Sequence, residues 1–218
     1  MSHIQQINFV KQVLSRFPEF SQTDTLLEIG SQNINGTIRD LIEARNYIGV
    51  DLSISKDVDF QCQGEFLELP DSWCDVVVST ECFEHAEHWK RIAINAIRTC
   101  KPGGLIIFTF AGLYRPAHGT TDSDTESSPF TNQYYSNISI DRYANSIALN
   151  EYFNYYGIEA QSDPGDTYFW GIRSGSMIAI NQETPTTILV DRLSRAQGQL
   201  GQALSRLANA NKIIAEYE

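Results

Sequence analysis

Two residues placed 21 positions apart have the chemistry to hold a nucleoside. Gly30 follows the apolar run TLLEI, and Asp51 ends the next apolar run, YIGVD. A glycine after a strand lets a ligand approach the backbone, and an acid at the tip of the next strand can accept hydrogen bonds from both ribose hydroxyls. The loop from Glu28 to Gly36 is not a GxGxxG sequence, because its glycines lie six positions apart. A strand-to-helix turn that binds no ligand is therefore the alternative.

Further polar and aromatic residues follow the next strands. Glu65 and Phe66 come after a short predicted strand at 58–60, where a carboxylate can accept the adenine amino group and a ring can cover the base. The segment STECFEH at 79–85 begins at the tip of the run CDVVVS, which is typical of a parallel strand buried on both faces. Because ligands of open α/β sheets bind at the carboxyl ends of the strands, these segments predict one site.

Strands and helices alternate along the chain as they do in βαβ units. We predict strands at 25–29, 47–51, 58–60, 74–79, 105–110, 155–161 and 176–180, and helices at 4–17, 36–45, 86–99 and 140–153. The aromatic segment 167–170 is compatible with either a strand or a loop. The pattern predicts an α/β fold with a mixed sheet and helices on both faces.

Residues 112–139 interrupt this alternation. They have no periodicity and are rich in Ser, Thr, Asp, Asn, Gly and Pro. A structureless stretch of this length is uncommon in a compact domain unless it has a function. We interpret it as a lid or binding loop.

The last 37 residues have a different sequence pattern. Apolar residues recur every seven positions, at Leu193, Leu200, Leu207 and Ile214, which predicts a heptad helix of about 30 residues. We therefore predict one domain at 1–181 and a C-terminal helix at 182–218. The helix either packs on its own domain or forms a coiled coil through 186–218 with a second copy or a partner helix.

Five segments in order resemble the motifs of class I S-adenosylmethionine-dependent methyltransferases, especially the small type 11 group that often accompanies glycan pathways. The segments are LEIGS with Gly36, VDLS at 50–53, GEFLELP at 64–70, STECFEH at 79–85 and KPGGLIIFT at 101–109. The resemblance covers about residues 25–181 and implies a Rossmann-like methyltransferase fold with a mostly parallel seven-stranded sheet. The first motif departs from the family because it lacks GxGxG, and Glu65 stands where the family has Asp.

The resemblance also implies S-adenosyl-L-methionine as the cofactor. By that likeness Glu28, Gly30 and Gly36 hold the methionine end, Asp51 holds the ribose, and Glu65 and Phe66 hold the adenine. Neighbouring positions complete the predicted set of cofactor-binding residues: Ser31, Leu52, Gly64, Ser79 and Glu81. A nicotinamide-dependent oxidoreductase fits less well, because the loop is no Gly-rich phosphate cradle and no lysine stands between Lys101 and Lys212 to form a Tyr-x-x-x-Lys pair.

His85 and His118 are the candidate general bases for an acceptor hydroxyl, because histidine titrates near neutrality. Packing on the following helix is the alternative for His85, and an exposed loop position is the alternative for His118. Arg115 could clamp an acceptor carboxylate or phosphate, or pair with acids of the same loop. We predict no metal, because methyl transfer requires none and the four cysteines form no CxxC pair.

Charge and composition limit the classes of molecule that we expect the protein to bind. The chain has 218 residues and a net charge of −11, which disfavours nucleic acid and anionic membrane surfaces as partners. The sequence has no signal peptide or membrane-spanning apolar run, so we predict a cytoplasmic protein. Residues 102–181 hold 14 of the 24 aromatic rings, which favours a sugar-like or small polar acceptor; they include Tyr134, Tyr135, Tyr168, Phe169 and Trp170.

Together these features predict S-adenosylmethionine-dependent methylation of a small polar acceptor, with a sugar or glycan precursor as the first candidate. The alternative is a catalytically silent scaffold of the same fold that acts through its C-terminal helix. The irregular first motif and the absence of an unambiguous base motivate that alternative.

Overall fold

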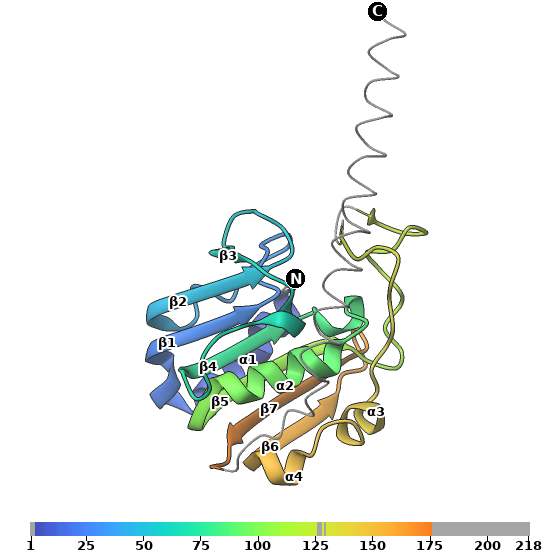
Figure 1. Cartoon of the computed structure of the whole chain (residues 1–218). Coiled ribbons are helices and arrows are strands. Elements are labelled where there is room, and N and C mark those ends of the chain that lie inside the picture. Colours follow the sequence, from blue (N-terminus) through green and yellow to red (C-terminus); the bar gives the residue numbers. More distant parts are fainter. Residues whose placement is uncertain (1–2, 126–127, 129, 176–218) are drawn as a thin grey trace, which may run out of the picture. The chain divides into compact units, whose positions relative to one another are not determined.

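One seven-stranded sheet organises the part of the chain that the structure describes. The structure, a computed structural model, describes residues 3–125, 128 and 130–175. The strand order is β3-β2-β1-β4-β5-β7-β6 (Figure 1). The strands are β1 (Gln22–Ile29), β2 (Glu43–Asp51), β3 (Phe60–Gln61), β4 (Cys74–Thr80), β5 (Cys100–Ala111), β6 (Phe153–Ala160) and β7 (Asp166–Arg173). Only β7 runs antiparallel to both of its neighbours, so the predicted mostly parallel seven-stranded sheet is confirmed.

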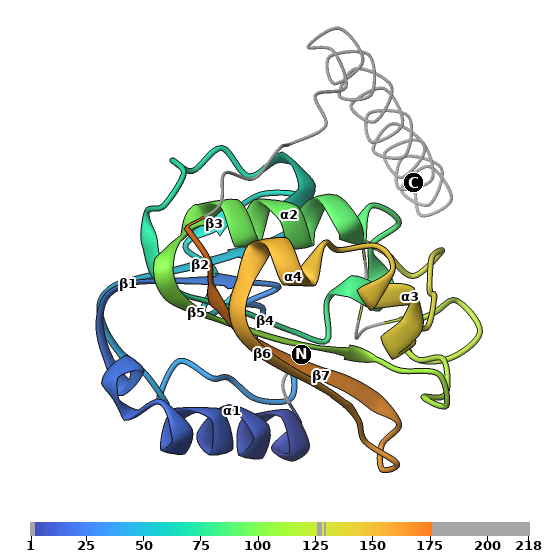
Figure 2. The same cartoon turned by 90° about the horizontal axis from the view of Figure 1, so that it is seen from below.

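Helices cover both faces of this sheet, as predicted. The α-helices are α1 (Ile4–Arg16), α2 (Trp89–Thr99), α3 (Ile140–Ala144) and α4 (Leu149–Tyr152), and the short 3-10 helices are η1 (Pro18–Ser21), η2 (Gly64–Phe66) and η3 (Phe83–His85). Figure 2 shows α1 on one side of the sheet and α2, α3 and α4 on the other. The described helices are therefore divided unequally between the two faces.

Alternate residues of the central strands build two separate cores. Leu26 and Val76 pack with Phe9 of α1, whereas their neighbours Leu27 and Val77 pack on the opposite face with Trp89 of α2. Because both faces are covered, the central strands read as continuous apolar runs rather than as an alternation. This burial explains why β4 was predictable to within one residue.

The helix predicted at 36–45 is wrong. Backbone pairing of Gln22 with Glu43 extends β2 into that region, and a single turn, in which the Leu41 amide donates to the Ile38 carbonyl at 2.9 Å, replaces the helix. Ile38 and Ile42 are nevertheless buried against the α1 core. Their helical spacing reports burial on one side, which a turn followed by a strand also achieves.

Other boundaries also differ. The helix predicted at 140–153 is split into α3 and α4, the helix predicted at 86–99 begins at Trp89, and 167–170 is part of β7. The KPGG turn lies inside β5, where a register shift against β4 and a positive φ of 81° at Gly103 mark a bulge. The strand predicted at 176–180, the boundary at 181 and the helix at 182–218 lie outside the described residues.

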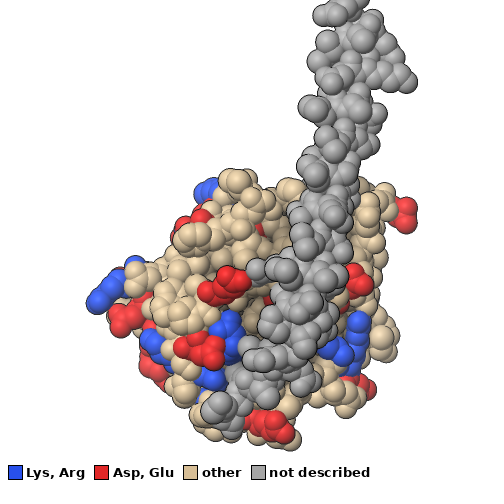
Figure 3. All heavy atoms as spheres, in the orientation of Figure 1, with Lys and Arg blue, Asp and Glu red and all other residues tan. Residues whose placement is uncertain are grey.

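Residues 112–139 connect β5 to α3, and their described positions contain no α-helix or strand. The loop is held by its own polar groups, because the side-chain amide of Asn137 donates to the carbonyls of both Gly112 and Arg115. Within the residues described, no helix is both long and apolar enough to cross a membrane. Figure 3 shows acidic and basic side chains interspersed on the visible face, without a continuous track of one sign.

Candidate functional site

The loops after β1 and β4 meet at Gly30. The amides of Gly30 and Ser31 both donate to the carbonyl of Val50, at 2.9 and 3.2 Å, which joins the first loop to the end of β2. Gly30 has φ +82°, and a Cβ at this position would lie 2.9 Å from the Cβ of Cys82. Only glycine fits this conformation and this contact, so the backbone stays open to a ligand.

Asp51 links the first two loops through its carboxylate. One oxygen accepts from the amide of Gln32 at 3.1 Å, and the other accepts from Leu52 and Ser53 at 2.6 and 3.3 Å. Asp51 and Leu52 are half-buried at the end of β2. A carboxylate has about four acceptor positions, so the exposed part of Asp51 can still accept from ribose hydroxyls.

The predicted adenine segment is fixed from α2. The side-chain amide of Asn95 donates to the carbonyls of Gly64 and Glu65, at 3.1 and 3.0 Å, and Arg98 donates to the carbonyls of Leu67 and Leu69. Gly64 is buried, and Glu65 and Phe66 are half-buried in η2. The sequence analysis missed Asn95 and Arg98, although both are polar residues of an otherwise apolar helix face.

Three side chains predicted to bind the cofactor are buried in the first loop or next to it. Glu28 is 2% exposed and accepts from the Tyr47 hydroxyl at 2.6 Å, Ser79 donates to the carbonyl of Ile29 at 2.8 Å, and Ser31 is buried. Burial raises the pKa of Glu28 to about 7. These side chains can position the loop, whereas Gly36 lies half-buried at the end of the loop.

The two predicted histidines come together at the end of β4. His85 ends η3, and His118 comes from the loop after β5. Their ring centroids are 5.1 Å apart, and the ring of Tyr135 lies 5.4 Å from His85 and 5.1 Å from His118. The alternatives were packing of His85 on the following helix and an exposed loop position for His118. The structure instead brings both rings into one cluster.

Two buried carboxylates adjoin these histidines. Glu84 is 0% exposed, and its Oε1 lies 3.8 Å from Nε2 of His118. Burial raises the pKa of Glu84 to about 7, and burial together with the charge of Glu84 raises the pKa of Glu81 to about 8. Burial lowers the pKa of His85 to about 3 and also lowers that of His118. His85 is therefore neutral at physiological pH and a weak base.

Arg115 has a partner other than the loop acids. Its Nε lies 3.6 Å from Oδ1 of Asp166, which is fully buried and also accepts from the side chain of Gln6 at 2.5 Å. Burial, and then the charge of Glu81, raise the pKa of Asp166 to about 7. Asp166 and Gln6 were not predicted from the sequence. The one signal for Gln6 was its position, as a polar residue, on the apolar face of α1.

The predicted aromatic platform is not assembled. Each of three rings packs on a core ring instead. The distances between ring centroids are 4.6 Å for Tyr168 and Phe9, 5.9 Å for Phe169 and Phe108, and 5.1 Å for Trp170 and Phe17. Because side chains of a strand alternate between faces, these three consecutive rings cannot form one surface. Of the five rings named from the sequence, Tyr135 lies against the histidines.

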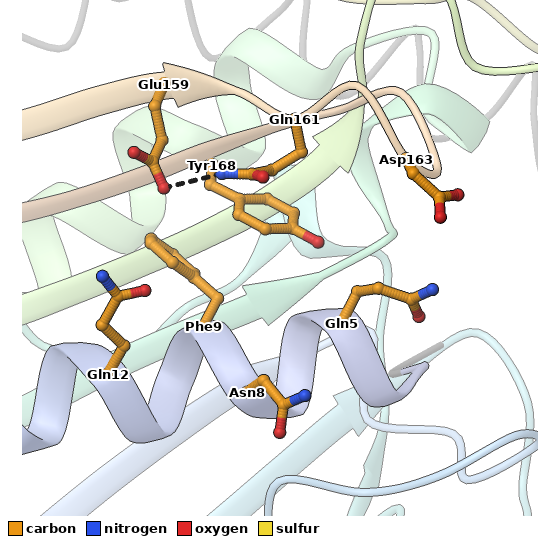
Figure 4. Close-up of a pocket in the computed structure, with 8 residues that line it drawn as sticks. All are labelled: Gln5, Asn8, Phe9, Gln12, Glu159, Gln161, Asp163 and Tyr168. Carbon is orange, nitrogen blue, oxygen red and sulfur yellow. Dashed lines mark hydrogen bonds between the residues drawn. The ribbon is translucent and has the colours of Figure 1, made fainter.

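A small cavity of about 250 Å³ lies elsewhere, between α1 and the β6–β7 hairpin. Figure 4 shows its mainly polar lining. It is lined by Gln5, Asn8, Phe9, Gln12, Glu159, Gln161, Asp163 and Tyr168. Its lining includes Tyr168, one of the rings named from the sequence, but none of the predicted cofactor-binding or catalytic residues.

Comparisons with known proteins agree with this geometry. Residues 2–157 match a protein family described as a methyltransferase domain. No curated protein matches the chain. The YcgJ protein from Bacillus subtilis is 12% identical with a TM-score of 0.54, and the match covers 80% of this chain and all of that one.

Two further solved structures have the same fold. Phosphoethanolamine N-methyltransferase 2 of Haemonchus contortus, in complex with S-adenosyl-L-methionine, is 15% identical with a TM-score of 0.57; the match covers 77% of this chain and 52% of that one, about half its length. The 1,6-didemethyltoxoflavin-N1-methyltransferase of Burkholderia thailandensis is 9% identical with a TM-score of 0.53, and the match covers 78% of each chain.

The family match spans most of the chain, and it includes the Gly30 loop, Asp51 and the segment after β4. The seven-stranded sheet, parallel except at β7, agrees with the mostly parallel sheet that the resemblance implies. The chain therefore belongs to the class I S-adenosylmethionine-dependent methyltransferases, whose cofactor is S-adenosyl-L-methionine.

Proposed function

We propose that the protein methylates a small polar acceptor that binds between the Gly30 loop and the histidine cluster. The observation that carries the proposal is the contact of Cys82 with Gly30, because it places the start of the segment 81–85 beside the cofactor loop. Glu81, Glu84 and His85 lie within three residues of Cys82 and are buried. Polar groups therefore converge next to the position where the methyl group would be offered.

In this proposal the cofactor contacts are those predicted from the sequence. S-adenosylmethionine supplies a methyl carbon on a sulfonium, which an acceptor oxygen or nitrogen attacks as the bond to sulfur breaks. Asp51 accepts from the ribose, Glu65 and Phe66 bind the adenine, and Gly30 leaves room for the methionine part. Glu28 and Ser79 hold the loop in place from behind. The protein contributes alignment and the removal of one proton.

His118 is better suited than His85 to accept that proton. It is less buried, and its Nε2 faces the carboxylate of Glu84, which would stabilise the protonated ring. His85, with its pKa lowered by burial, is suited to a contact in the neutral form. The described part of the loop 112–139 would cover the acceptor.

A small acceptor is supported by two of the similar solved structures, a phosphoethanolamine N-methyltransferase and a 1,6-didemethyltoxoflavin-N1-methyltransferase. Our finer candidate, a sugar or glycan precursor, rests on the sequence resemblance and on Tyr135, since the rings of β7 are core residues. We also propose a cytoplasmic location, which the four free cysteines support.

Calorimetry with S-adenosylhomocysteine tests the cofactor site. We expect binding by the native protein and about 100-fold weaker binding by Asp51→Ala, because two charge-assisted hydrogen bonds are lost. Asp24→Ala is the matched control, since Asp24 is an exposed acid at the other end of the neighbouring strand. Absence of binding at millimolar ligand, or equal affinity of the two variants, contradicts the proposal.

The low basicity of His85 favours one alternative, the catalytically silent scaffold. Transfer of labelled methyl groups to a panel of nucleotide sugars, amines and small phenols separates the two functions, because any turnover excludes a silent protein. Association through 186–218 is a separate proposal. Truncation after Asn181 tests it, and an unchanged oligomeric mass would rule it out.

A further inference from the structure

Glu84, His85 and His118 bring one carboxylate and two imidazoles to one point. One ligand-type atom from each side chain lies within 4.8 Å of the other two. Glu84 and His85 are buried and His118 is half-buried. One carboxylate and two neutral imidazoles form a donor set that divalent transition metals prefer.

Three buried polar atoms of this cluster lack a close partner. Among the described residues, neither carboxylate oxygen of Glu84 nor Nε2 of His85 has a hydrogen-bond partner within 3.5 Å, and the Glu84 carboxylate has only weaker interactions with the backbone of Glu84 and Ala111. Buried polar atoms are costly when they stay unpaired, and a carboxylate is the costliest. A cation bound between these atoms would compensate the cost of all three at once.

The contacts around the two rings are compatible with metal binding. Nδ1 of His118 lies 3.2 Å from the carbonyl oxygen of Pro116, to which it can donate, and this leaves a lone pair on Nε2. That nitrogen faces the Glu84 carboxylate at 3.8 Å, beyond hydrogen-bond distance. A backbone carbonyl that fixes the second ring nitrogen is the usual support of a metal-binding histidine. Nδ1 of His85 contacts the Ser128 hydroxyl at 3.4 Å.

The loop that carries His118 is held against His85 by a glycine. Gly119 has φ +61°, and a Cβ there would lie 2.5 Å from Oγ of Ser128 and 3.0 Å from Cε1 of His85. The amide of Ser136 donates to the carbonyl of Glu84 at 2.9 Å and joins the far end of the loop to η3. The three donors therefore belong to a built cluster.

We propose that Glu84, His85 and His118 bind one divalent transition-metal ion, such as Zn²⁺ or Co²⁺, next to the acceptor. Bonds of about 2.1 Å give ligand separations of about 3.4 Å, so binding draws the donors together by up to about 1.4 Å. The remaining coordination positions take water or an acceptor oxygen. When the ion is bound, Nε2 of His118 is a ligand and not the proton acceptor, and the ion would instead lower the pKa of the hydroxyl bound to it. The use of the metal for acceptor binding rests on the proposed function, whereas metal binding itself does not.

We predicted no metal from the sequence, because methyl transfer requires none and the cysteines form no CxxC pair. The ligands here are an adjacent Glu-His pair and a histidine 33 positions further on. Such a separation carries no local spacing signal. A proton shared by His118 and Glu84 is the competing occupant, and the experiment must distinguish the two.

Full-length protein stripped with a chelator is titrated with Co²⁺, and the visible ligand-field absorption is recorded. We expect one Co²⁺ per chain in the native protein and an affinity lower by about 100-fold or more in His118→Ala. His88→Ala is the matched control, because His88 precedes α2 and is outside the cluster. We expect it to bind Co²⁺ like the native protein.

Native protein without Co²⁺ absorption beyond that of the free ion, or equal Co²⁺ binding by the two histidine variants, overturns the proposal and leaves a shared proton. Glu84→Gln provides a second variant of unchanged volume, with the same expected loss, should His118→Ala fail to fold. S-adenosylhomocysteine calorimetry on the same samples keeps the two proposals separate: cofactor binding without Co²⁺ binding rejects the metal alone, and the reverse rejects the methyltransferase role alone.

Discussion

The two halves of the candidate site satisfy their polar groups in different ways. In the cofactor half, which comprises Gly30, Asp51 and Gly64–Phe66, backbone amides and the side chain of Asn95 hold the loops in place. In the acceptor half, which comprises Glu84, His118 and Asp166, the buried carboxylates lie 3.6 to 3.8 Å from the basic side chains that face them, Arg115 and His118. The polar groups of the first half are paired at hydrogen-bond distance, whereas the buried carboxylates of the second lie farther from their basic partners.

This difference has an energetic consequence. A carboxylate that accepts several amide hydrogen bonds keeps its charge at little cost, whereas a buried one with a distant partner costs several kcal/mol. Functional sites are often built at the expense of stability. Substitutions in the acceptor half should therefore change stability most, and those in the cofactor half should chiefly change ligand affinity.

The largest effect is expected for Arg115→Ala, which removes the cation that faces the buried Asp166. At pH 8 we expect a loss of about 3 kcal/mol in the free energy of unfolding, measured in urea, because an uncompensated charge remains buried. Arg45→Ala is the matched control, since Arg45 and Asp24 are also 3.6 Å apart but are exposed. That variant should lose about 0.5 kcal/mol or less.

A double variant identifies the cause. Asp166→Asn in the Arg115→Ala background removes the buried charge and should restore part of the loss. Equal losses for Arg115→Ala and Arg45→Ala would show that burial of the pair has no role, and the contrast between the two halves would fail.

The next effect concerns Glu28, the buried carboxylate of the cofactor half. Its pKa is raised to about 7 by burial, so between its ordinary value of 4.5 and 7 the folded chain keeps a proton that the unfolded chain releases. Stability from this group is complete below pH 4.5 and is lost as the pH rises through 7. Glu28→Gln should therefore be more stable than the native protein by about 3 kcal/mol at pH 8 and equally stable near pH 4.

Urea unfolding at several pH values measures this difference. Glu43→Gln, an exposed glutamate of the neighbouring strand, is the control and should show no such gain at pH 8. A Glu28→Gln variant that keeps the native pH dependence would show that the raised pKa belongs to another group. Glu28 would then be no exception to the expectation that the cofactor half chiefly affects ligand affinity.

A smaller effect separates two glycines of nearly equal φ. Gly30 and Gly103 have φ of +82° and +81°, but a Cβ meets Cys82 at 2.9 Å in the first case and nothing within 4 Å in the second. Gly103→Ala should lose about 1 kcal/mol of stability, from backbone strain alone. Gly30→Ala should lose about 1 kcal/mol more and weaken S-adenosylhomocysteine binding. If both variants bind alike, the close approach at Gly30 is unimportant for the cofactor.

The sequence indicates the positions of the cofactor half more directly than those of the acceptor half. Strand tips and the residues that follow them are local signals, so Gly30, Asp51 and Glu65 could be placed at one edge from the order of elements alone. Asp166 and Gln6 meet across 160 positions, and no periodicity records such a contact. The same holds for the pairing of His118 with Glu84.

The errors in secondary structure have a related cause. Apolar spacing at Ile38, Leu41 and Ile42 shows which residues face the core, but a helix and a turn can bury them equally well. The strand pairing of Gln22 with Glu43 decided between the two, and it is a non-local contact. By contrast, the run at 74–79 is apolar on both faces, which leaves no such ambiguity.

The smallest predicted effect tests whether the cofactor half is held from α2. Asn95→Ala removes two hydrogen bonds to the backbone of Gly64 and Glu65, so η2 loses an anchor while its own side chains remain. We expect S-adenosylhomocysteine to bind about fivefold more weakly, which corresponds to about 1 kcal/mol, with little change in stability. Asn46→Ala is the control, since its side chain makes one exposed hydrogen bond on β2. Native affinity in Asn95→Ala would mean that the adenine segment holds its shape without α2.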